Sequence, residues 1–235
     1  LLVVTAEDFL TEYYKNILHV NIKSLVVENK LEPHSDIEVT PTKNSNSFSY
    51  PIKIGYFGLL RCEWSIMALT EIANNLGDKV EITLAGLVSV PENLFNTLCS
   101  LSNVTYIGKY KSPDDLSSLY GSIDIVWGCY PPISENDWNL RWARPNRFYE
   151  ACFFKKPLIS RLGSNDAKEV KKRAIGLVTD AKTGSEVIKD IRTITPSLLN
   201  EWSQNMLELP QKVYLYSDES TQLEESIDSL VQHKK

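Results

Sequence analysis

The stretch "IKIGYFGLLRCEWSIMALTEIANNLGDKVEITLAG", residues 52–86, contains a complete strand–helix–strand unit. Its first part, residues 52–58, is rich in β-branched and aromatic residues and predicts a strand that ends at Gly58. Residues 65–77 follow as a helix closed by a glycine, and residues 79–86 predict a second strand. This alternation is typical of an α/β fold with a parallel sheet.

The segments after residue 86 keep the same alternation of strands and helices as far as residue 180. Their short apolar strands, bounded by glycines, suit a sheet that is buried on both faces. The sequence therefore predicts a doubly wound, Rossmann-like parallel sheet. Further strands are expected at residues 103–108, 123–130, 156–160 and 175–180. Helices are expected at residues 90–101, 112–122, 145–155, 164–174, 183–194 and 195–207, with Ser112 as the N-cap of the second and Pro113 in its first turn.

The chain divides into four segments by composition. Residues 1–30 predict a strand, a helix and a strand, which we interpret as the tail end of an N-terminal α/β domain. Residues 31–51 are polar and rich in proline, serine and asparagine, and predict a linker. The main domain is expected at residues 52–205, and residues 206–235 form a C-terminal tail with an amphipathic helix. Since the chain begins inside a predicted strand and lacks an initial methionine, we expect a fragment of a longer protein.

Charge and cysteine content exclude several classes of function. The chain of 235 residues is 43% hydrophobic and has a net charge of -5, which argues against a general binder of nucleic acid or of anionic membranes. No apolar run approaches the roughly 20 residues that span a bilayer, and we expect no signal peptide, because the sequence shows no basic stretch followed by an apolar one at its start. The cysteines lack CxxC spacing and have no clustered histidines, so we expect buried free thiols in a cytoplasmic protein and no zinc site. They are Cys62, Cys99, Cys129 and Cys152.

Ligands of doubly wound sheets bind at the carboxyl ends of the strands, so the residues after each strand are candidates for a site. Gly55 and Gly58 allow close approach of the backbone, and Arg61 follows at the start of a helix, where an anion such as phosphate is favoured. The pattern is neither GxGxxG nor a P-loop, which makes a nicotinamide enzyme improbable. The alternative is a tight turn with a solvated arginine.

A second candidate lies in "RPNRFYEACFFKKPLIS", residues 144–160, where a loop becomes a helix. Arg147 and Glu150 are three residues apart and share a helical face, with Arg144 just before them. A carboxylate there can accept two hydroxyls of a sugar, and an arginine can bind a phosphate. The alternative is an intrahelical ion pair without a ligand.

The long loop at residues 130–145 contains Trp138 and Trp142. We expect it either to take part in the functional site or to form an interface with a missing partner domain. The acidic pair Asp114 and Asp115 fits a helix N-terminus better than a catalytic role. The three histidines lie outside the main sheet, so no general base is evident. They are His19, His34 and His233.

Several stretches, taken in order, resemble the C-terminal domain of GT-B glycosyltransferases of the family-four, or group 1, type. The resemblance covers roughly residues 50–205, and its most specific element is "PNRFYEACFFKKPLI", similar to a Pro-x-Lys-x-x-Glu segment followed by Lys-Pro-Val-Ile. The other stretches are "IKIGYFGLLR", "ITLAG", "VTYIGKYKSPDDLSSLYGSIDIVWGCY" and "AIGLVTD".

The resemblance implies a site for a nucleotide-diphosphate sugar, linked to UDP or GDP, without a cofactor or a metal. Gly58 and Arg61 would face the diphosphate, Arg147 would replace a lysine of the family near the phosphates, and Glu150 would bind the ribose hydroxyls. Residues 107–110, with Tyr110, would flank the base, and residues 128–132 would approach the donor sugar.

The sequence departs from the family at two positions. Where many members carry a second glutamate, eight residues before the ribose-binding one, this chain has Trp142. Glu63 and Trp64 stand where a basic residue often follows the phosphate-binding arginine. Both departures concern contacts with the donor sugar.

The resemblance further implies a hexosyltransferase-like enzyme that moves a glycosyl group to an acceptor hydroxyl in polysaccharide or glycoconjugate synthesis. Arg61 and Arg147 would be the catalytic residues, because they would stabilise the departing diphosphate. The partners would be the donor and an acceptor glycan or lipid-linked sugar, the latter bound by an absent N-terminal domain that could also contact the inner face of the membrane. The fragment alone is expected to be inactive. The alternatives are a non-catalytic nucleotide-binding or scaffold module of the same fold and a GT-B-type nucleotide-sugar epimerase.

Overall fold

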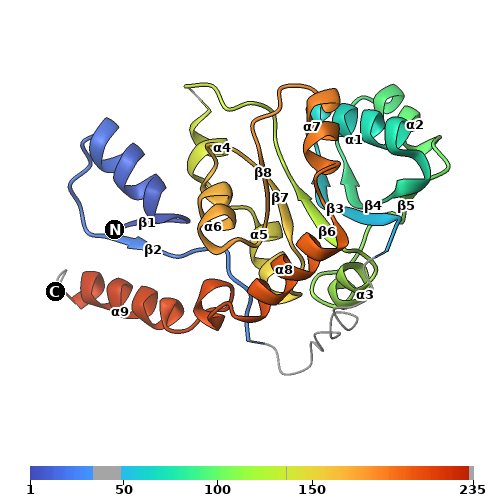
Figure 1. Ribbon diagram of the computed structural model, residues 1–235. Coiled ribbons are helices and arrows are strands. Elements are labelled where there is room, and N and C mark those ends of the chain that lie inside the picture. Colours follow the sequence, from blue (N-terminus) through green and yellow to red (C-terminus); the bar gives the residue numbers. More distant parts are fainter. Residues whose placement is uncertain (34–48, 136, 233–235) are drawn as a thin grey trace.

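The computed structural model describes residues 1–33, 49–135 and 137–232, and its centre is a six-stranded parallel sheet (Figure 1). The strand order is β5-β4-β3-β6-β7-β8, so the order reverses between β3 and β6. This is the order of the doubly wound dinucleotide-binding fold, and it confirms the predicted fold class. The strands are β3 (Ile52–Leu60), β4 (Val80–Val88), β5 (Val104–Tyr106), β6 (Ile125–Gly128), β7 (Leu158–Arg161) and β8 (Gly176–Thr179).

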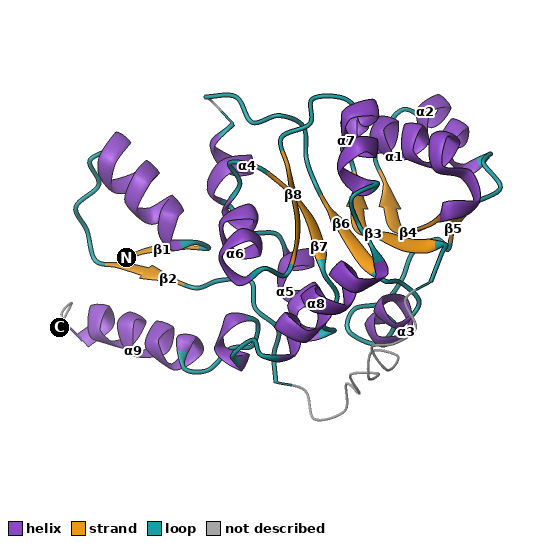
Figure 2. Cartoon of the chain, in the orientation of Figure 1, coloured by secondary structure: helices purple, strands orange, loops and turns teal. Residues whose placement is uncertain are grey.

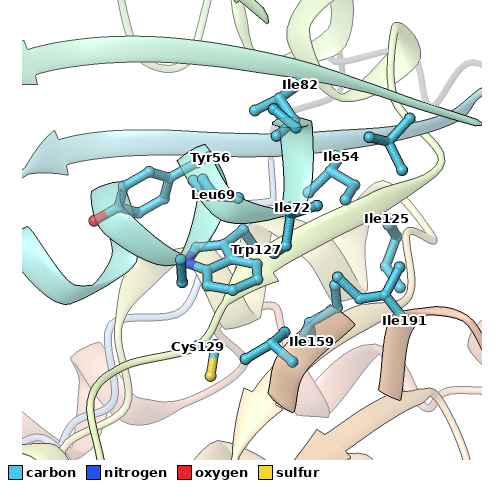
Figure 3. Packing of buried hydrophobic residues seen from close by; sticks show 14 of the residues in the cluster. Ile54, Tyr56, Leu69, Ile72, Ile82, Ile125, Trp127, Cys129, Ile159 and Ile191 are labelled. Atoms are coloured by element: carbon cyan, nitrogen blue, oxygen red, sulfur yellow. The ribbon is translucent and has the colours of Figure 1, made fainter. Parts of the chain in front are cut away.

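Helices cover both faces of the sheet (Figure 2). Side chains of the first face, including Ile54, Ile82 and Trp127, point toward Leu69 and Ile72, as Figure 3 shows. The helices of this face are α1 (Glu63–Leu76), α2 (Glu92–Cys99) and α7 (Gly184–Ile191), and those of the other face are α3 (Leu116–Gly121), α5 (Asn146–Phe153) and α6 (Asn165–Arg173). Helix α8 (Pro196–Leu207) contributes to both apolar clusters.

The N-terminal residues form a separate small unit. Strands β1 (Leu2–Val4) and β2 (Ser24–Val26) pair in parallel with each other, and the helix η1 (Phe9–Ile17) connects them along the chain, as the sequence predicts. The last helix, α9 (Glu219–Gln232), lies beside this unit in Figure 1, and the Lys23 ammonium donates a hydrogen bond to the Ser229 hydroxyl. Residues 34–48 of the predicted linker lie outside the described residues, and the domain boundaries stay a prediction.

Several predicted boundaries were wrong, most clearly those of β3 and α3, and the predicted loop at residues 130–145 contains the short helix α4 (Trp138–Trp142). Strand β3 does not end at Gly58 but continues to Leu60, because it pairs with β4 residue by residue as far as Leu60 and Val88. Helix α3 begins at Leu116 rather than at Ser112, because a turn precedes it. The Asp115 amide donates to the carbonyl of Lys111 at 2.9 Å, and the Asp115 carboxylate accepts the Lys111 amide at 2.7 Å.

The cysteines are free, but only Cys129 and Cys152 are buried, whereas Cys62 and Cys99 are half-buried. None of the helices within the described ranges is both long and apolar enough to cross a bilayer.

The extended pairing of β3 with β4 depends on glycine. A Cβ on Gly86 would lie 1.8 Å from the carbonyl oxygen of Gly58, and Gly86 has a φ of +126°. Gly108 also has a positive φ, of +98°, but a Cβ there would have no neighbour within 4 Å. We expect Gly108→Ala to cost about 1–3 kcal/mol of unfolding free energy through backbone strain alone. Gly86→Ala should cost more, because the strands must also separate. Urea denaturation of both variants measures the difference, and equal losses would contradict the close approach.

Candidate functional site

A cavity of about 560 Å³ opens at the carboxyl ends of β3 and β6, where the strand order reverses. Ligands of doubly wound folds bind at this switch point. All five residues that the sequence predicts for binding line the cavity. They are Gly58, Arg61, Tyr110, Arg147 and Glu150.

Arg147 is buried in the first turn of α5 and connects the ends of the two strands. Its Nε donates to the carbonyl of Phe57 at 2.9 Å, and its Nη1 donates to the carbonyl of Trp127 at 3.1 Å. The guanidinium carbon lies 4.7 Å from the ring centroid of Tyr56. Because a guanidinium has five N–H groups, these bonds leave donors for a ligand. Arg147 is thus a cation in the cavity wall that also joins the ends of two strands by hydrogen bonds. The sequence did not indicate this second, structural role.

Glu150 lies one helical turn further along α5 and is also buried. Its Oε2 accepts a hydrogen bond from the hydroxyl of Tyr120 at 2.6 Å. Burial raises the pKa of Glu150, against the opposing effects of the Tyr120 hydrogen bond and the charge of Arg147. Within the described part of the chain, no ion pair joins Glu150 to Arg147. The alternative of an intrahelical ion pair between these two residues is therefore not observed.

The N-termini of two helices meet at the cavity. Cys62 caps α1, because its sulfur accepts a hydrogen bond from the amide of Ser65 at 3.3 Å, and the exposed Arg61 precedes it. Pro145 and Asn146, at the start of α5, line the opposite side. Helix N-termini carry partial positive charge and free amides. Together with two guanidinium groups, they make this end of the cavity suited to an anion.

The remaining wall is aromatic and apolar. Tyr110 is half-buried, and burial followed by the nearby charge of Glu150 raises its pKa to about 12. Tyr130 and Pro131, from the loop after β6, and Leu140 also line the cavity. Ile107, which was expected near the base, is exposed, and it is not part of the lining.

Arg144 does not reach the cavity. Its Nη1 lies 3.0 Å from the Glu28 carboxylate of the N-terminal unit, and its Nε lies 3.6 Å from the Asp166 carboxylate of α6. Arg144 therefore joins the N-terminal unit to the main domain.

The tryptophans of the long loop also contact the N-terminal unit. They belong to the short helix α4 (Trp138–Trp142). The ring centroid of Trp138 lies 4.7 Å from that of Tyr13, and Trp142 packs 6.1 Å from Phe9. These contacts favour an interface role for both rings, and they place Trp142 away from the cavity lining.

Sequence reasoning missed Tyr120 and Tyr56, whereas Tyr130 and Pro131 fall within the residues 128–132 that were expected at the site. Tyr120 lies in a predicted helix, where its spacing indicates only an apolar face. A chemical argument could have pointed to Tyr120, because a buried tyrosine hydroxyl generally has a hydrogen-bond partner. Among the described residues, no group of three His, Cys, Asp or Glu side chains is placed to hold a metal ion.

Comparison with known proteins relates the chain to proteins of carbohydrate synthesis. It is 28% identical over 203 residues to the succinoglycan biosynthesis protein ExoL of Rhizobium meliloti, and the match covers 84% of this chain and 50% of ExoL. No protein-family model matches the chain.

Solved structures share the fold. Sucrose-phosphate synthase from Thermosynechococcus elongatus superposes with a TM-score of 0.68 at 14% identity, over 98% of this chain and 58% of that one. Anabaena HepE in complex with UDP and glucose gives 0.62 at 14% identity, over 97% of this chain and 63% of that one. The chain has the fold of GT-B glycosyltransferases. The GT-B resemblance expected from the sequence is thereby confirmed for the fold. The chain spans only about half to two thirds of the length of these proteins.

Asp166, at the start of α6, is a buried carboxyl group beside Arg144. Its Oδ1 has no hydrogen-bond partner among the described residues, although Arg144 lies nearby, and burial raises its pKa from 3.8 to about 7. The folded state therefore holds a proton that the unfolded state releases near pH 4. Stability should fall as the pH rises from about 4 to about 7.

We expect Asp166→Asn to remove this fall, which is on the order of a few kcal/mol. Arg144 keeps Glu28 as its partner in the variant. Urea denaturation between pH 4.5 and 7.5 gives the slope of stability with pH for both proteins. Asp180→Asn, which removes an exposed carboxylate, is the control. A variant that keeps the slope of the wild type would show that Asp166 is not its source.

Proposed function

We propose that this chain is the donor-binding part of a glycosyltransferase and that its cavity holds a nucleotide-diphosphate sugar linked to UDP or GDP. One observation carries the proposal. Arg61, Arg147 and the N-termini of α1 and α5 converge on the same cavity as the carboxylate of Glu150. Cations beside a carboxylate match a ligand that has both phosphates and sugar hydroxyls.

In this proposal, the diphosphate binds between Arg61, Arg147 and the amides that follow Gly58. Glu150 accepts the ribose hydroxyls, and the ring of Tyr110 flanks the base. When the bond between the sugar and the diphosphate breaks, negative charge develops on the leaving oxygen. Fixed donors directed at that charge lower the barrier, and neither a metal nor a cofactor is required for this effect.

The comparisons support the substrate class. HepE, which shares the fold, was solved with UDP and glucose, and ExoL is a succinoglycan biosynthesis protein. We place the acceptor, a glycan or a lipid-linked sugar, with the half of the ExoL length that this chain does not span. We assign a contact with the inner face of the membrane to that same half of the ExoL length.

A second candidate is a non-catalytic nucleotide-binding module. The position of Trp142 favours it, because the ring is buried near Phe9 where many GT-B enzymes would have a second glutamate. Both candidates require nucleotide binding, and they differ only in turnover by the longer protein. No contact of the described residues favours an epimerase.

We expect one nucleoside diphosphate to stabilise the chain thermally at millimolar concentration, because a ligand that binds the folded state raises stability by mass action. UDP, GDP, ADP and NAD form the panel, and calorimetry measures the dissociation constant. Glu150→Ala should lose most of the binding. Glu201→Ala, which removes an exposed carboxylate from α8, should keep it. Failure of both UDP and GDP to bind would contradict the proposed function, whatever ADP and NAD do.

Arg61→Ala should weaken the diphosphate about tenfold to a hundredfold, which is the cost of losing a charged hydrogen bond. The corresponding nucleoside, which lacks phosphates, should bind the variant and the wild type equally. Arg192→Ala removes an exposed arginine near the amino ends of β3 and β4 and is the control. Equal losses for the nucleoside and the diphosphate would show that Arg61 does not act on the phosphates.

A further inference from the structure

Tyr120 is fully buried beneath the cavity, between two aromatic rings. Its ring centroid lies 4.9 Å from that of Phe154 in a stacked arrangement and 5.3 Å from that of Phe57 in an edge-on arrangement. These contacts come from the end of α5 and from β3, while Tyr120 itself belongs to α3. The ring cannot turn without displacing its neighbours, so its hydroxyl is a donor at a fixed position.

The hydroxyl is directed at Glu150. It donates to Oε2 at 2.6 Å, which is a short distance typical of a donor bound to an ionised carboxylate. A glutamate side chain has several rotatable bonds, and ordering it costs free energy when a ligand binds. The bond to Tyr120 fixes one oxygen in advance, and the carboxylate forms part of the cavity wall.

Three groups face Glu150 from the elements packed around it. Tyr120 donates from α3, Arg147 lies one turn before it on α5, and Tyr110 lies in the loop after β5. Burial raises the pKa of Glu150, while the Tyr120 hydrogen bond and Arg147 lower it. The same hydroxyl that fixes the carboxylate therefore also favours its charged form, which accepts hydrogen bonds and does not donate them.

We propose that Tyr120 is a positioning residue that holds Glu150 charged and oriented for the ribose hydroxyls of a nucleotide. The inference rests on the proposed function, because it assigns the ribose to Glu150. Tyr120 acts through Glu150 and does not touch the ligand.

The test compares Tyr120→Phe with a matched variant. Tyr149→Phe also removes a buried tyrosine hydroxyl that donates to a glutamate, but its partner is Glu28 of the N-terminal unit, at 3.1 Å. The first readout is the dissociation constant of UDP and of GDP between pH 5 and 8. The second is the titration of the Glu150 carboxyl carbon by NMR without nucleotide, assigned with Glu150→Gln.

We expect Tyr120→Phe to weaken the bound nucleotide about threefold to tenfold at pH 7. The pH at which binding is half lost should rise, and the titration midpoint of Glu150 should rise with it. Tyr149→Phe should change neither, although it also removes a buried hydroxyl. Glu150→Gln should bind weakly at every pH, because it has no carboxyl to titrate.

The two proposals fail in different ways. If the wild type binds a nucleotide and Tyr120→Phe keeps its affinity and pH profile, the role of Tyr120 is overturned and the proposed function stands. An unchanged Glu150 titration in Tyr120→Phe overturns that role without any nucleotide. If the wild type binds neither UDP nor GDP, both proposals fall, whatever the titration shows.

Discussion

The cavity exists because β3 and β6 separate at their carboxyl ends. The two strands pair at only two positions, Ile54 with Ile125 and Gly55 with Val126, and the pairing then stops. Beyond that point, the guanidinium of Arg147 bonds to a carbonyl from each strand. It satisfies acceptors that a continuous ladder would have used. The space that the separation leaves is the cavity, and the group that bridges it is a cation.

Helix α5 presents different faces to different parts of the molecule. Arg147 and Glu150 are three residues apart and face the cavity, whereas Tyr149 points away and donates to Glu28 of the N-terminal unit. Arg144, just before the helix, binds the same Glu28 carboxylate. One short helix therefore connects two residues of the cavity wall with the contact between the two parts of the chain. A shift of the N-terminal unit would act directly on the helix that carries the site.

The order of strands and helices could be predicted from the sequence, because apolar periodicity and glycine positions are local signals. The shared face of Arg147 and Glu150 was predictable for the same reason, since helical spacing alone places them together. The end of β3 could not be predicted from the sequence. A glycine such as Gly58 is typical of a strand end, and only the structure shows that Gly86 of the neighbouring strand lies against it. Partners that come from distant elements, such as Tyr120 for Glu150, depend on packing that no local pattern encodes.

Arg147, which stands where the sequence resemblance implies a lysine, suits this geometry. A lysine ammonium is a compact charge on a flexible stem, whereas the guanidinium is a rigid plane with donors on separate nitrogens. Here Nε and Nη1 reach carbonyls on two different strands, at 2.9 and 3.1 Å. A lysine could keep the positive charge but could not hold both strand ends in this planar arrangement. Arg147 is buried and, among the described residues, forms no ion pair with a carboxylate, so its charge is incompletely balanced by the protein. A buried cation of this kind is stabilised when an anion arrives, and a diphosphate in the cavity would supply that charge.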